Sequence, residues 1–109
     1  MSTDRELLEF AAKAAGLDVR FDITEQPMSI DLAGTGRYWN PLRDDGDALR
    51  LAVKLGIEYG FGWNNDGTIQ RIIIDDELHI IVENNDPCAA TRFAITRAAA
   101  EIGKAKEDK

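Results

Sequence analysis

Two isoleucine-rich runs constrain the fold of this chain more than any other feature. Residues 72–74 and 80–82 are continuous apolar stretches inside two segments, 68–75 and 77–83, whose length and flanking turns are typical of strands. A strand with one face in water usually alternates between apolar and polar residues, whereas a strand covered on both faces is apolar throughout. The runs therefore predict that helices cover both faces of this part of the sheet.

A third strand is expected directly before these two, over residues 57–63. Its apolar side chains share one face, namely Ile57, Tyr59, Phe61 and Trp63. The sequence Asn-Asn-Asp-Gly at 64–67 favours a hairpin turn, because asparagine and glycine tolerate positive φ. With a second tight turn at Asp75 and Asp76, the three strands are predicted to form an antiparallel meander.

Three helices are predicted from capping residues and apolar stripes. The first has Ser2 or Thr3 as its cap and Gly16 at its end, and the last begins after Asp86 and ends at Gly103. The middle helix is capped by Asp44 or Asp45 and ends at Gly56. Its core-facing stripe is predicted to consist of Leu49, Ala52 and Val53.

Residues 17–37 leave two alternatives open. Leu17, Val19, Phe21 and Ile23 alternate with charged residues, which is typical of a half-buried strand. The same stretch is also compatible with an extended arm, because a Gln-Pro pair and the turn-forming sequence LAGTG follow it.

These elements predict a three-layer α/β/α sandwich, with three helices and a largely antiparallel sheet of three or four strands. A two-layer α+β domain is the alternative. At 109 residues the chain fits a single domain, expected over residues 1–103, followed by a polar tail at 104–109.

Charge and composition narrow the classes of partner. The formal net charge is −7, which disfavours direct binding of nucleic acid, because phosphate contacts need clustered lysine and arginine. The acidic balance favours solubility, with an acidic face for a basic partner as the alternative. No apolar run approaches a membrane span, the start lacks signal-peptide features, and the single Cys88 excludes an internal disulfide. We therefore expect a cytoplasmic protein.

Two motifs carry a family resemblance. YWNPLRDDGDALRLAVKLG at 38–56 and DPCAATRFAITRAAAEIG at 86–103 resemble the phage ABA-sandwich domain, a group of small proteins of tailed phages and prophages. The resemblance implies an α/β/α sandwich and a phage or prophage origin, and hence the cytoplasm of a bacterial host. It brings no established activity and no catalytic residues.

The stretch before the middle helix holds most of the candidate site residues. Tyr38, Trp39 and Asn40 suit stacking on a ring and bonding to its edge, although an aromatic pair before a helix is more often a hydrophobic staple. Three carboxylates follow, on Asp44, Asp45 and Asp47. They suit helix capping, with metal binding or a partner contact as alternatives.

Arg92 completes the candidate set. With Arg50 and Arg97 it could form an anion site, or it could pair with surface carboxylates. Neither Cys88 nor the single His79 has the neighbours that nucleophilic catalysis or a metal site needs. No catalytic residue, metal or cofactor is predicted.

The sequence thus predicts a non-enzymatic phage accessory protein that acts by binding a host or phage protein, or by self-association. Inhibition of a host defence complex is one such role. It is expected only because small acidic phage proteins are associated with it, and no residue of this chain points to it. The alternative is a small-ligand or nucleotide-binding module that uses the loop from Tyr38 to Asp47.

Overall fold

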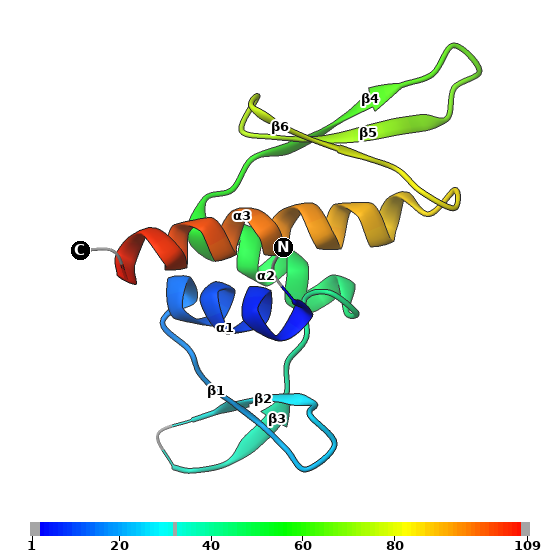
Figure 1. Ribbon diagram of the computed structural model, residues 1–109. Coiled ribbons are helices and arrows are strands. Elements are labelled where there is room, and N and C mark those ends of the chain that lie inside the picture. The colour runs from blue at the N-terminus through cyan, green and yellow to red at the C-terminus, as the bar shows by residue number, and fades with distance from the viewer. Residues whose placement is uncertain (1–2, 32, 108–109) are drawn as a thin grey trace.

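The computed structural model describes residues 3–31 and 33–107 as an α+β fold with three helices and two separate antiparallel sheets (Figure 1). The helices are α1 (Asp4–Ala15), α2 (Asp45–Leu55) and α3 (Pro87–Glu107). The N-terminal sheet consists of β1 (Asp18–Phe21), β2 (Pro27–Ile30) and β3 (Gly36–Tyr38). The C-terminal sheet consists of β4 (Tyr59–Trp63), β5 (Ile69–Ile74) and β6 (Leu78–Ile81).

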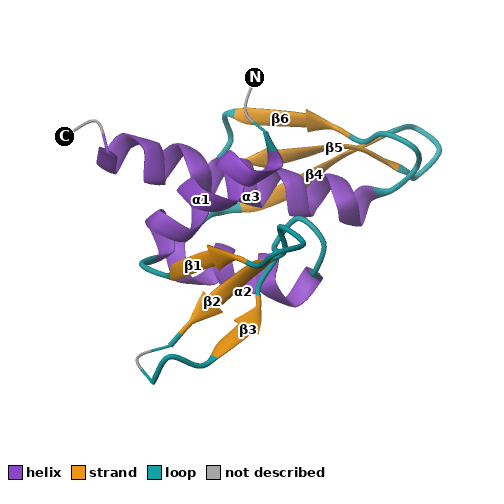
Figure 2. Ribbon diagram, turned by 60° about the horizontal axis from the view of Figure 1, so that its bottom comes forward, coloured by secondary structure: helices purple, strands orange, loops and turns teal. Residues whose placement is uncertain are grey.

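The helices form the middle layer, and the two sheets lie on opposite sides of it (Figures 1 and 2). α1 packs along α3, while α3 packs on β5 and α1 contacts β1. The predicted sandwich, a single sheet between outer helical layers, is therefore wrong, and only its coarser α+β character is confirmed. No described helix combines the length and the apolar character that a membrane span needs.

The predicted helix starts are confirmed by their caps. The Thr3 hydroxyl accepts a hydrogen bond from the Glu6 N–H at 3.2 Å, and an Asp44 carboxylate oxygen accepts from the Asp47 N–H at 2.8 Å. Both helices end at glycines with left-handed backbones, as predicted. These signals lie within a few residues of the helix ends, so local sequence is enough to identify them.

The predicted end of α3 at Gly103 is wrong, because the helix continues to Glu107. Gly103 is buried and lies so close to the backbone of Phe10 that a β-carbon has no room there. The glycine therefore permits a close helix crossing instead of ending the helix. Beyond it, Lys106 Nζ donates to the carbonyl of Ala14 at 3.1 Å, so residues 104–107 belong to the helix and not to a tail.

The N-terminal sheet resolves the open alternative at residues 17–37 in favour of a strand. β1 pairs with β2 and β2 with β3, neither of which was predicted. Val19 and Phe21 pack against the core as expected, whereas Ile23 in the following turn is fully exposed.

The C-terminal sheet has the predicted meander order, with turns at 64–67 and 75–76. Its expected two-sided cover is wrong. Ile72 and Ile74 are buried under α3, but no described element covers the other face. Ile81, on that face, is 60% exposed, and Ile73 beside it is half-buried.

Candidate functional site

Strand β4 has an open backbone edge, since it pairs only with β5. The N–H of Asp75 donates to the carbonyl of Glu58 at 2.9 Å. Along an antiparallel pair, residues that exchange backbone hydrogen bonds alternate with residues whose backbone groups point away. In this register the backbone N–H and C=O of Gly60 point toward β5. The backbone N–H and C=O of Tyr59 and Phe61 point to the open edge.

Three aromatic side chains line this edge. Phe61 makes edge-to-face contacts with Tyr59 and with Trp63, at ring-centroid distances of 6.2 and 6.3 Å. Phe61 pairs in register with the buried Ile72, so the row faces the helical layer. α3 packs chiefly on β5, so the aromatic row on β4 extends beyond the edge of α3. The three aromatic side chains are therefore 39–60% exposed.

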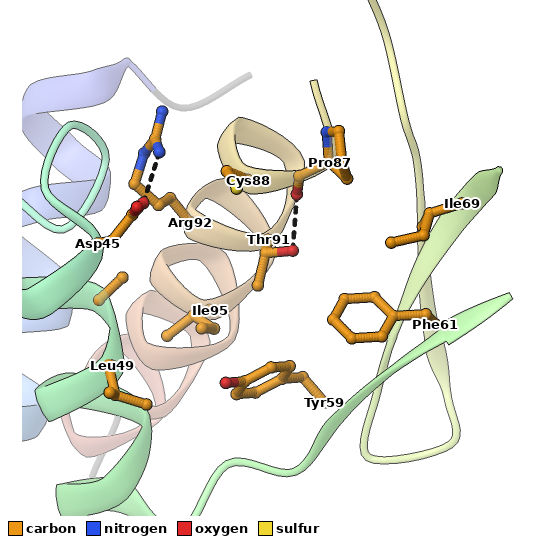
Figure 3. Close-up of a pocket in the computed structure, with 11 residues that line it drawn as sticks. Asp45, Leu49, Tyr59, Phe61, Ile69, Pro87, Cys88, Thr91, Arg92 and Ile95 are labelled. Carbon is orange, nitrogen blue, oxygen red and sulfur yellow. Dashed lines mark hydrogen bonds and ion pairs between the residues drawn. The ribbon is translucent and has the colours of Figure 1, made fainter. Parts of the chain in front are cut away.

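A cavity of about 310 Å³ lies between this aromatic row, α2 and the first half of α3 (Figure 3). We call it the β4 groove, and its apolar walls are formed mainly by Leu49, Tyr59, Phe61, Ile69 and Ile95. Figure 3 shows the rings of Tyr59 and Phe61 pointing from β4 toward α3, with Leu49 of α2 across the cavity from them. Pockets of this size hold small apolar groups.

The second helix has an exposed apolar side, of which Leu49 lines the groove. Leu49 is 51% and Val53 is 73% exposed, and a spacing of four residues puts both on one side of α2. The prediction that these two residues face the core is wrong. Ala52, the third residue of the predicted stripe, is buried as predicted, and Ala48 and Leu51 are buried with it. The exposed pair could not be recognised from periodicity, because each apolar residue has apolar neighbours along this helix.

The rim of the β4 groove carries one ion pair. Arg92 Nη1 donates to Asp45 Oδ1 at 2.6 Å, while its Nε donates to the carbonyl of Leu42 at 3.1 Å. Arg92 thus pairs with a carboxylate, one of the two predicted alternatives, and joins α3 to the start of α2. Cys88 is exposed at the same rim.

The predicted aromatic pair does not form one platform. Tyr38 is 65% exposed on the outer face of the N-terminal sheet, whereas Trp39 is 5% exposed within the core. Alternation along the strand turns the two rings in opposite directions. Asn40 holds the turn, since its Oδ1 accepts from the Leu42 N–H at 3.0 Å and its own N–H donates to Asp47. Burial of Trp39 and the turn role of Asn40 agree with the staple interpretation.

The three carboxylates at the start of α2 each have a partner within the fold, and Arg50 lies against two of them, Asp44 at 3.8 Å and Asp47 at 2.7 Å. Asp44 caps the helix, Asp45 pairs with Arg92, and Asp47 accepts from Arg50 at 2.7 Å and from the Asn40 N–H at 2.9 Å. Asp47 is only 6% exposed. Within residues 3–31 and 33–107, no three His, Cys, Asp or Glu side chains gather in a geometry that could hold a metal ion.

Hydrogen bonds shift the titration of one pair on the N-terminal sheet. The Thr24 hydroxyl and then the Gln26 N–H lower the pKa of Asp22 below its ordinary value of 3.8. Tyr38 Oη donates to Asp22 Oδ2 at 3.0 Å, and this bond raises the pKa of Tyr38. The Asp22–Tyr38 hydrogen bond holds the turn between β1 and β2, and it lies away from the β4 groove.

Comparisons with protein-family models, with curated proteins and with solved structures found no match for this chain. The resemblance of residues 38–56 and 86–103 to the phage ABA-sandwich domain therefore stays a prediction. The three-layer sandwich that it implies is not the architecture of this chain.

Proposed function

We propose that this chain is a non-enzymatic protein-binding module that takes up an extended segment of a basic partner protein beside β4. One observation carries the proposal. The free backbone edge of β4 and the β4 groove lie next to each other, and both are open. An extended segment can use both, with its backbone on the edge and alternate side chains in the groove.

The pairing surface is short and specific. The backbone groups of Tyr59 and Phe61 are available, and a bulge between Gly62 and Trp63 interrupts the regular edge. A partner residue opposite Phe61 directs its side chain to the helical side of the sheet, where the groove lies. Leu49, which lines the groove, then packs on the added strand, and this contact removes its apolar surface from water.

Charge favours a basic partner. The chain has a net charge of −7, and exposed carboxylates lie near both ends of β4. Glu58 and Asp75 lie at its start, and Asp66 lies in the turn after it. Lysine or arginine beside the paired stretch would meet these groups and accelerate association.

The phage setting of this function belongs to the same proposal. A role as a phage accessory protein in the bacterial cytoplasm, and inhibition of a host defence complex, rest on the resemblance of the two motifs alone. The nucleotide-binding alternative that used the loop from Tyr38 to Asp47 is not favoured, because Tyr38 and Trp39 lie on opposite faces.

A synthetic peptide that alternates valine with lysine tests the proposal by calorimetric titration. We expect saturable binding that weakens about tenfold in Leu49→Ala, since that side chain would lose its burial against the peptide. Ile81→Ala is the matched control, because Ile81 is 60% exposed, against 51% for Leu49, but lies on the outer face of the sheet. A valine–glutamate peptide should bind more weakly.

Three results would count against the proposal. One is the absence of saturable binding. Another is equal binding of a peptide in which prolines replace the residues that pair, because proline cannot donate to a strand edge. The third is concentration-dependent dimerisation through β4, which would assign the edge to a second copy of the chain.

A further inference from the structure

A second cavity lies between the N-terminal sheet and α2, away from the β4 groove. Its volume is about 420 Å³, within the usual range for small-ligand pockets. Figure 2 shows the N-terminal sheet lying beside α2. We call this space the sheet–helix cavity, and its polar lining includes Ser29, Asp31, Thr35, Arg37, Arg50 and Lys54.

The cations of this cavity outnumber its carboxylates, although the chain as a whole is acidic. Among the described residues, neither Arg37 nor Lys54 forms an ion pair with a carboxylate. Asp31 is engaged locally, since its Oδ1 accepts from the Thr35 N–H at 2.8 Å and from the Ala33 N–H. Two cations therefore remain available to a ligand. Arg50 beside them holds Asp47 through Nη2 at 2.7 Å, so its Nη1 and Nε are the groups that a ligand can use.

The cavity also has apolar lining residues, and one of them carries a donor without a partner. They include Trp39, Leu17 and Leu51. The Trp39 indole N–H has no hydrogen-bond partner among the described residues, although the side chain is 95% buried. Arg71 Nε is the one described buried side-chain polar atom that lacks both solvent and a partner, so the indole N–H keeps access to solvent. The sheet–helix cavity is the space that Trp39 lines.

We propose that the sheet–helix cavity binds a small phosphorylated compound with a flat apolar part. Its phosphate lies between Arg37, Arg50 and Lys54, with the Ser29 and Thr35 hydroxyls as further donors, because guanidinium and ammonium groups bind phosphate through charge-assisted hydrogen bonds. The apolar part lies on Trp39 and Leu51. The net charge of −7 repels an extended polyanion, so the ligand is small. This site is independent of the β4 groove.

Fluorescence of Trp39 tests the proposal directly. Trp63→Phe leaves Trp39 as the single tryptophan of the chain, and adenosine monophosphate, inorganic phosphate and adenosine serve as probes. We expect a saturable change with adenosine monophosphate, weaker binding of phosphate alone, and the weakest binding of adenosine. Arg37→Gln and Lys54→Gln should each weaken the nucleotide about tenfold.

Two matched variants separate a site from general charge. Arg20→Gln removes an exposed cation from the same sheet but outside the cavity, and it should leave affinity within about twofold. Lys54→Arg keeps the charge and should do the same. The proposal is overturned if adenosine monophosphate causes no saturable change up to about 10 mM, or if Arg20→Gln weakens binding as much as Arg37→Gln.

Discussion

Gly103 of α3 lies directly against the backbone carbonyl of Phe10 in α1, and this contact sets how closely the two long helices approach. Gly103→Ala should destabilise the protein by about 3 kcal/mol, because the added methyl group forces the helices apart. Helix propensity alone predicts the opposite sign, a gain of about 1 kcal/mol. Urea unfolding measures the difference. Gly60→Ala is the control, since a β-carbon there meets nothing within 4 Å.

The two aspartates at the start of α2 should differ in their contribution to stability. Asp47 is 6% exposed and accepts from Asn40 and Arg50, so Asp47→Ala should lower the free energy of unfolding by about 2–3 kcal/mol. Asp45 has an exposed carboxylate that pairs with Arg92, and Asp45→Ala should cost less than about 1 kcal/mol. Chemical denaturation of both variants checks this order, which equal losses would refute.

The hydrogen bonds to Asp22 should make stability depend on pH in one direction. The pKa of Asp22 is lower in the folded protein than its ordinary value of 3.8, so its contribution is present above 3.8. That contribution is lost as the pH falls through the folded pKa. Unfolding of the wild type and of Asp22→Asn should therefore differ at about pH 6 and converge in more acidic solution. A difference that grows toward acid would show that the sign is wrong.

Two leucines of α2 should differ strongly in how much stability their truncation costs. Leu51 is 3% exposed, and Leu51→Ala should cost about 3 kcal/mol through the cavity it leaves. Leu49 is 51% exposed at the β4 groove, and Leu49→Ala should change stability by about 0.5 kcal/mol or less. Thermal unfolding compares the two. A large loss in Leu49→Ala would mean that this side chain supports the fold and is not reserved for a partner.

Local features of the fold could be predicted from the sequence. Thr3, Asp44 and Asp86 cap their helices as predicted, because a cap depends only on residues within the first turn. The hairpin of β4 and β5 followed from the turn sequence at 64–67 for the same reason. By contrast, β2 and β3 are short and contain proline and glycine, so their pattern is weak. They form through pairing, since β2 lies between β1 and β3 and is hydrogen-bonded to both.

The covering of surfaces could not be predicted, because it depends on elements far apart in the sequence. The isoleucine run of β5 suggested cover on both faces, yet only the face with Ile72 meets α3. On the outer face, the Arg71 side chain lies across Gly62, where a β-carbon would be 2.7 Å from its Nε. The β4 groove was missed for a related reason. The sequence pattern correctly predicts that the aromatic side chains of β4 share one face, but it does not show how far α3 extends over them.

The central claim is that the open edge of β4 accepts a partner strand, and amide hydrogen exchange at single residues tests it most directly. The N–H groups of Tyr59 and Phe61 should exchange rapidly in the free protein and become strongly protected when the valine–lysine peptide is added. The N–H groups of Gly60 and Gly62, already turned toward β5, should change little. Unchanged exchange at Tyr59 and Phe61 in the presence of saturating peptide would contradict the account.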